Sequence, residues 1–208
     1  MGVTKRRGSK RKAELRLEPY LAYLVFAAVG VGVYSLAQDA RLVLLWLVLL
    51  SASLIYADQR PIELGYDLAK VGQGAAVGLV LSIPLLILAF EPLLATSVRL
   101  YPLGSGSTVF LGLVLVAAPV EEVFFRGVLQ GEHGFWAAAG LYALAGVVFF
   151  LPIAGSFPVV LGAMVVGMAV LAVVYGYVAL RYGLAAGIAC HVMVNLMLFV
   201  LPVILGPG

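Results

Sequence analysis

Two adjacent glutamates, followed four residues later by an arginine, are the residues of this sequence best suited to chemistry. Glu121, Glu122 and Arg126 lie at the end of an apolar stretch, although a charged side chain at the centre of a lipid-facing helix costs about 2.5–3.5 kcal/mol. On a helix, Glu122 and Arg126 share one face and are predicted to pair, whereas Glu121 points about 100° away. A half-buried carboxylate without a local partner is suited to act as a general acid or base.

Pro119 adds a second feature to the same stretch. A proline inside a helix leaves the carbonyl four residues earlier, that of Leu115, without its amide partner. In a membrane this carbonyl has to bond to protein or water, so we expect water near Glu121, and water is the co-reactant of hydrolysis. The alternative is structural: near a membrane surface, Glu122 and Arg126 can reach water along their side chains and simply anchor the helix end.

A second polar pair, His191 and Asn195, interrupts the last apolar segment. Steps of four residues place them on one helix face with Gly183 and Gly187, and small residues at this spacing let membrane helices approach closely. We therefore expect both polar side chains to face the interior of a bundle. A lone intramembrane histidine is more often a hydrogen-bonding residue than a catalyst, but glutamates at a similar depth favour the catalytic interpretation.

The composition places most of the chain in a membrane. Of 208 residues, 63% are hydrophobic and 11% are charged, whereas soluble domains have about 45–50% and about 25%. A single cysteine, Cys190, excludes an internal disulfide, and with two histidines, His133 and His191, zinc-finger ligand sets are excluded as well. Any metal site would need carboxylates.

Seven apolar segments are long enough to cross a bilayer, which takes about 17–25 residues. They are residues 19–37, 41–57, 75–98, 108–125, 135–152, 157–180 and 183–205. The sequence therefore predicts an all-α fold, a polytopic transmembrane helical bundle of about seven spans. Its organisation would be a basic tail at 1–17 and a single transmembrane domain at 18–208.

The basic residues indicate the orientation of this bundle. Residues 1–17 hold seven of the 13 lysines and arginines, and such a tail beside an apolar segment suits anionic lipid headgroups better than nucleic acid. With the tail in the cytoplasm, four more basic residues fall on that side: Arg60, Lys70, Arg126 and Arg181. Only Arg41 and Arg99 fall on the other side. This asymmetry predicts an integral protein of the plasma membrane with a cytoplasmic N-terminus.

The order and spacing of these motifs resemble the CPBP family, the Abi-like membrane proteases related to the type II CAAX prenyl endopeptidases. Its first motif, Glu-Glu-x-x-x-Arg, is matched by Glu121, Glu122 and Arg126. Its last motif, His-x-x-x-Asn, is matched by His191 and Asn195, after a run at 176–183 that is similar to the family's Gly-Tyr-x-x-x-Arg-x-Gly. The resemblance covers about residues 60–200.

The resemblance implies a function and a role for each of these residues. Glu121 would activate water, Glu122 and Arg126 would be its structural partners, and His191 with Asn195 would stabilise the scissile carbonyl or bind a metal. The implied reaction is cleavage of a membrane-associated or lipidated peptide near the cytoplasmic membrane face. A divalent metal such as zinc is the cofactor that the resemblance allows. The implied partners are membrane lipids and the peptide, and no nucleic acid.

The middle motif of the family, Phe-x-x-x-His, is matched only in part. Phe150 fits and is expected to contribute to substrate binding, but Ala154 stands where the histidine would be. A three-ligand zinc site built on Glu121 and His191 would then lack one ligand. Three functions stay open: a glutamate-dependent endopeptidase, a catalytically impaired relative that binds a membrane or lipidated peptide, and a small proton-coupled transporter using Glu121 and His191.

Overall fold

The computed structural model describes residues 18–154 and 158–206, and every regular element in these two ranges is a helix. Six helical segments are long and apolar enough to cross a membrane, and one shorter apolar helix precedes them. This confirms the predicted all-α polytopic bundle of about seven spans. The predicted basic tail, residues 1–17, lies outside the described residues.

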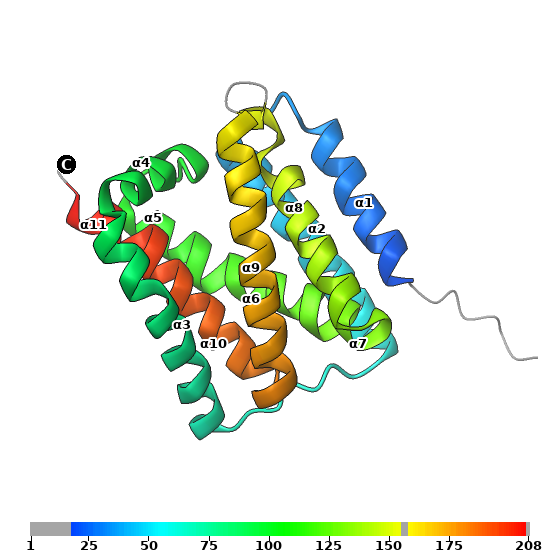
Figure 1. The fold of residues 1–208 in the computed structure, drawn as a ribbon. Coiled ribbons are helices and arrows are strands. Elements are labelled where there is room, and N and C mark those ends of the chain that lie inside the picture. The colour runs from blue at the N-terminus through cyan, green and yellow to red at the C-terminus, as the bar shows by residue number, and fades with distance from the viewer. Residues whose placement is uncertain (1–17, 155–157, 207–208) are drawn as a thin grey trace, which may run out of the picture.

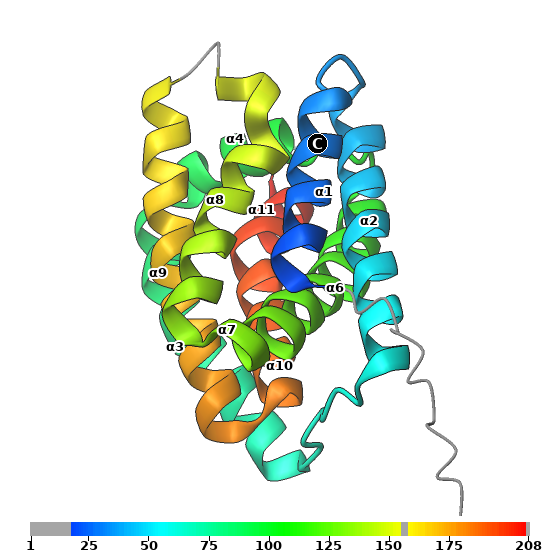
Figure 2. The ribbon, with the colours of Figure 1, turned by 90° about the vertical axis from the view of Figure 1, so that its right-hand side faces the viewer.

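The chain begins with α1 (Pro19–Gly32), which is the short apolar helix. It is followed by α2 (Gln38–Gln59), α3 (Leu68–Leu88) and α4 (Phe90–Leu100). After the central segment described below come α8 (Phe135–Ala154) and α9 (Pro158–Tyr182), and then α10 (Leu184–Asn195), η3 (Leu196–Val200) and α11 (Leu201–Leu205). Figure 2 shows α1 and α2 side by side at one edge of the bundle and α9 at the opposite edge.

The central segment is one long helical run, Gly106–His133, and it is the most buried of the six membrane-length segments. It consists of α5 (Gly106–Phe110), η1 (Leu111–Ala117), α6 (Ala118–Glu122), η2 (Val123–Leu129) and α7 (Gln130–His133), where η1 and η2 are π-helical. It crosses the middle of the bundle obliquely (Figure 1). π-helical turns are rare and often mark functional sites, and here they flank the two glutamates of α6.

Two predicted spans differ from the helices of the structure. The first, 19–37, forms a helix only as far as Gly32. The third, 75–98, is divided: α3 starts earlier, at Leu68, and ends at Leu88, and Ala89 leaves the helical conformation (φ −133°, ψ 31°) before α4 begins. The physical reason is Pro92, whose ring would clash with the carbonyl of Leu88 if α3 continued.

Glycines of α3 hold this helix against α10, as small residues at four-residue spacing lead one to expect. A Cβ atom at Gly74 would overlap the backbone carbonyl of Ala186, and one at Gly78 would overlap that of Cys190. Figure 1 shows the two helices running together. Because Cys190 precedes His191, this close approach also fixes the position of the histidine.

A kink near the end of α8 leaves backbone carbonyls without helical partners. Pro152 has no amide hydrogen for the carbonyl of Val148, and Phe150 departs from helical geometry (φ −117°, ψ 21°). In a membrane these carbonyls need another donor.

Arg41 supplies that donor. Its guanidinium donates to the carbonyls of Val148 and Phe149 on α8 and, at 2.8 Å, to that of Gly30 on α1. Gln38 donates to the Phe149 carbonyl as well, at 3.1 Å. Arg41 is fully buried, so it does not face the outer solvent as a charge at a span boundary would. It ties the start of α2 to two neighbouring helices.

The glycine packing generates a testable prediction. Gly78→Ala should lower the free energy of unfolding by about 1–3 kcal/mol, because the added methyl group meets rigid backbone rather than a side chain that can turn away. Unfolding in mixed detergent micelles measures the effect. Gly72→Ala on the same helix is the matched control, since a Cβ atom there has no neighbour within 4 Å. Equal losses in both variants would contradict close packing at Gly78.

Candidate active site

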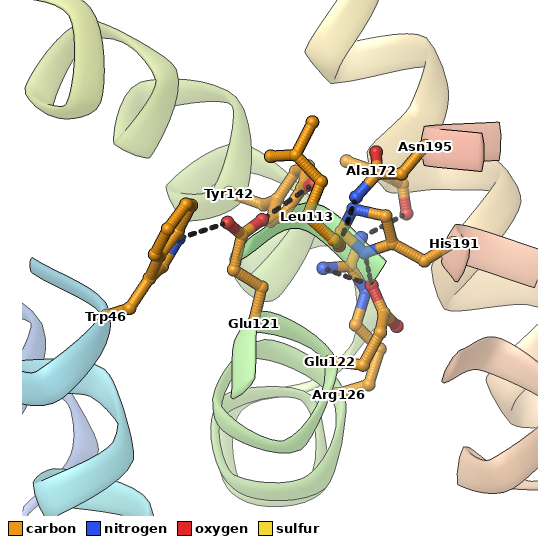
Figure 3. Close-up of polar contacts among 9 residues, drawn as sticks. All are labelled: Trp46, Leu113, Glu121, Glu122, Arg126, Tyr142, Ala172, His191 and Asn195. Atoms are coloured by element: carbon orange, nitrogen blue, oxygen red, sulfur yellow. Dashed lines mark hydrogen bonds and ion pairs between the residues drawn. The ribbon is translucent and has the colours of Figure 1, made fainter. Parts of the chain in front are cut away.

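The two glutamates of α6 are buried and point to different sides of the helix. Glu121 is 7% exposed and Glu122 is fully buried. Figure 3 shows the Glu121 carboxylate directed toward α2 and α8, and the Glu122 carboxylate directed toward α10. Adjacent positions on a helix are about 100° apart, so the two acids reach separate surroundings from one turn.

Glu121 is held by two uncharged hydrogen-bond donors. The indole Nε1–H of Trp46 donates to Oε1 at 3.0 Å, and the hydroxyl of Tyr142 donates to Oε2 at 3.1 Å. Both aromatic residues are buried. Each carboxylate oxygen therefore has a partner from a different helix, α2 for Oε1 and α8 for Oε2.

Glu122 is surrounded by basic side chains. Arg126 places Nη1 3.4 Å from Oε1 of Glu122, and Nδ1 of His191 lies 3.0 Å from the same oxygen. The pair predicted between Glu122 and Arg126 is therefore present. The imidazole of His191 stacks on the ring of Tyr175, with 4.4 Å between centroids and 17° between planes. These contacts fix the position and the tilt of the histidine ring.

Arg126 connects the two sets of contacts. Its guanidinium lies over the ring of Tyr142, 4.2 Å from the centroid, and Nη2 donates to the Ala172 carbonyl at 3.2 Å. A buried guanidinium is stable only when it is paired and hydrogen-bonded. Tyr142 thus touches both halves of the site, through its hydroxyl at Glu121 and through its ring face at Arg126.

Asn195 links the last motif to the central segment. Its Nδ2 donates to the carbonyl of Leu113 at 3.0 Å, and Leu113 belongs to the π-helical turn η1. Asn195 is also the last residue of α10 before the π-helical segment η3. The amide therefore fixes the end of α10 against the central segment.

A buried cavity of about 50 Å³ joins the motifs. Glu121, His191 and Asn195 line it, and Phe150 forms part of its wall. Glu122 and Arg126 stand beside it and support the histidine. A cavity needs about 10–15 Å³ to hold one water, so this space accommodates water next to the Glu121 carboxylate. The remaining lining combines aromatic and aliphatic side chains, among them Trp46, Tyr101, Tyr142, Tyr175, Met164, Met168 and Phe199.

The sequence did not predict that three of these aromatic residues belong to the site: Trp46, Tyr142 and Tyr175. Each lies in an apolar segment, where an aromatic residue is typical of the core or of the membrane interface. One signal was available, because an indole N–H or a phenol inside a membrane needs a hydrogen-bond partner. The sequence does not show which partner, since Trp46 and Glu121 come from different helices.

The described side chains do not fit a three-ligand zinc site. In the part of the chain that the structure describes, no group of three or more His, Cys, Asp or Glu residues is arranged to hold a metal ion. Both oxygens of Glu121 accept hydrogen bonds, and Nδ1 of His191 is engaged by Glu122. Ala154, which replaces the expected histidine, ends α8, and its side chain lies outside the described residues.

A comparison with known protein families shows which proteins the segment that contains this site is similar to. Residues 104–197 match the family described as type II CAAX prenyl endopeptidase Rce1-like. This part of the chain is similar to the Rce1-like family. The matched range contains both motifs, from Glu121 to Asn195, and confirms the resemblance to CPBP proteins. No curated protein and no solved structure matches the chain.

The matched family is one of peptidases, which supports a peptidase, and the membrane-length helices of the described residues make the chain an integral membrane protein. The match is shorter than the 60–200 expected from the motifs. It starts after α4, so Trp46 and Arg41 on α2 lie outside it. The Rce1-like segment therefore supplies both acids, the histidine and the asparagine, while one donor to Glu121 comes from elsewhere in the chain.

The buried ion pair generates a second prediction. Arg126→Met should lower the free energy of unfolding by about 3–5 kcal/mol, because it leaves the Glu122 carboxylate buried without its guanidinium partner. The double variant with Glu122→Gln should recover much of this loss. Unfolding titrations of the purified protein in mixed micelles compare the variants.

The control for this experiment is Arg60→Met. Arg60 pairs with Glu132, but 42% of its side chain is exposed, and a pair of that kind contributes at most about 1 kcal/mol. If Arg126→Met lowers the free energy of unfolding no more than Arg60→Met does, the buried pair does not stabilise the bundle.

Proposed function

We propose that this protein is an intramembrane endopeptidase that cleaves peptide bonds near the cytoplasmic membrane face with water activated by Glu121. One observation carries this proposal. Glu121, His191 and Asn195, which come from distant parts of the sequence, line a single buried cavity that has room for water. A carboxylate beside water and next to an imidazole and an amide is a site for hydrolysis.

Glu121 acts first as a base and then as an acid. Its carboxylate takes a proton from water while the water oxygen attacks the carbonyl carbon of the peptide, and an oxyanion forms. The protonated Glu121 then gives this proton to the amide nitrogen as the C–N bond breaks. The products are a carboxyl group and an amine, and Glu121 returns to its starting form.

His191 and Asn195 stabilise the oxyanion. Glu122 engages Nδ1 of His191, which leaves Nε2 as the ring nitrogen for the substrate. The Asn195 side chain uses one N–H on Leu113 and keeps a second N–H. Donors that are fixed before the reaction stabilise a developing charge strongly where water is scarce. Glu122 and Arg126 hold the histidine in place and do not touch the substrate.

The substrate in this proposal is a membrane-associated or lipidated peptide. Apart from the polar groups around Glu121, the cavity wall is apolar and includes Phe150, so it suits apolar residues beside the scissile bond. We place the site at the cytoplasmic side of the plasma membrane, with the N-terminus in the cytoplasm, on the distribution of lysine and arginine.

A second candidate function is favoured by Ala154. The family motif that the sequence resembles has a histidine where this chain has Ala154, so the chain lacks one imidazole of that motif. The protein would then bind a membrane or lipidated peptide in the same cavity without cleaving it.

Glu121→Gln should abolish cleavage while the fold is retained. Removing a general base lowers the rate by about 10²–10⁴-fold. The glutamine oxygen still accepts the hydrogen bond from Trp46, and its NH2 group can donate to the hydroxyl oxygen of Tyr142. The measurement is product formation from a library of membrane-tethered peptides, followed by mass spectrometry. Glu91→Gln, at an exposed position of α4, is the control and should cleave like the wild type.

Equal cleavage by the wild type and Glu121→Gln would exclude the glutamate mechanism. Peptides that are retained but not cleaved by the wild type would support the second candidate function.

A further inference from the structure

We propose that Trp46 and Tyr142 are positioning residues that fix the Glu121 carboxylate for proton transfer, so that α2 forms part of the active site. This inference rests on the proposed function. It extends the site beyond the two family motifs and, with Trp46, beyond residues 104–197 that match the family.

The first argument is the distribution of the two hydrogen bonds. Trp46 occupies Oε1 from the α2 side at 3.0 Å, and Tyr142 occupies Oε2 from the α8 side at 3.1 Å. Donors on both oxygens, from opposite helices, fix the plane of the carboxylate as well as its place (Figure 3). A carboxylate oxygen can accept a further hydrogen bond, so this arrangement leaves lone pairs for water in the cavity.

The second argument is the absence of charge on both donors. Hydrogen bonds from indole and phenol make a carboxylate a somewhat weaker base, but a cation bonded directly to it would weaken it more, because these donors carry no net charge. The cation of the site, Arg126, is paired with the neighbouring acid Glu122 instead. The two glutamates therefore have different roles: Glu122 pairs with the cation, and Glu121 remains available to take a proton.

The third argument is that both donors are themselves held rigidly. Trp46 is buried in a stripe of α2 side chains with Leu45 and Leu49. Arg41, five residues earlier, anchors α2 to α1 and α8. The central helix passes close to this ring, since a Cβ atom at Gly112 would lie 3.9 Å from Cζ3 of the indole.

Tyr142 is fixed from two directions. The guanidinium of Arg126 lies on one face, and the ring of Phe125 meets it edge-to-face with 5.1 Å between centroids. A catalytic group has to be held close to its productive geometry by the side chains around it. Because the surrounding side chains hold Trp46 and Tyr142 in place, these two residues can hold the Glu121 carboxylate in its productive geometry.

Kinetics of two conservative variants test the proposal. Tyr142→Phe removes one hydroxyl and keeps the ring, and Trp46→Phe removes the N–H and keeps an aromatic side chain. Each should lower kcat about 10–100-fold, the value of one hydrogen bond to a charged group, with KM changed less than about 2-fold because neither contact binds the substrate. Leu129→Ala is the control, since Leu129 is fully buried in η2 but does not line the cavity. It should lower stability and leave kcat unchanged.

A spectroscopic measurement tests the contact without relying on activity. The chain has two tryptophans, and Trp136 is 75% exposed, so a Trp136→Phe background leaves Trp46 as the single reporter. Adding Glu121→Gln removes the charge beside the indole and should shift the Trp46 emission and the ultraviolet resonance Raman band of its N–H. Adding Glu91→Gln should shift neither.

The outcomes separate this inference from the proposed function. The positioning role is overturned if both Trp46→Phe and Tyr142→Phe keep the wild-type kcat, or if Glu121→Gln leaves the Trp46 spectrum unchanged. Neither result contradicts the endopeptidase function. A wild-type protein with the spectral response but no cleavage overturns the endopeptidase function and confirms the contact. A fall in kcat as large in Leu129→Ala as in Trp46→Phe shows a general packing effect and overturns the inference.

Discussion

Two carboxylates on consecutive residues of a membrane helix impose the constraint on which this structure depends. Each acid has to be satisfied inside the protein, and their side chains leave the helix in directions about 100° apart. One set of partners cannot serve both. The bundle therefore provides two surroundings: the indole and phenol of Trp46 and Tyr142 for Glu121, and the basic groups of Arg126 and His191 for Glu122.

The same requirement governs the other buried polar groups. Arg41 donates to carbonyls at the kink of α8, and Asn195 donates to a carbonyl of the π-helical turn η1. In both places an irregular stretch of backbone is stabilised by a side chain from another helix. Since lipid offers no substitute for these bonds, each contact also fixes how two helices are placed against each other. The polar groups thus specify the packing around the cavity.

The sequence predicted those features that depend on local spacing. The four-residue step from Glu122 to Arg126 indicated the ion pair, which is present. The steps of four from Gly187 to His191 and Asn195 indicated that both polar side chains face the interior, and both are buried. The number of spans followed from segment length. Contacts between distant segments were not predictable, since no pattern connects Trp46 with Glu121 or Arg41 with the α8 kink. The roles of the individual site residues stay predictions.

The size of the cavity has a consequence for turnover. About 50 Å³ holds water but is far smaller than the about 300–1,000 Å³ of pockets that enclose small-molecule ligands. If the protein cleaves peptides as proposed, a peptide needs more room beside Glu121 than this cavity provides, so neighbouring helices would have to move apart to admit it. The free energy of that opening is subtracted from the binding energy of every substrate. A peptide substrate that also binds the outer surface of the protein, far from the scissile bond, would offset the free energy of opening better than one that binds only in the cavity.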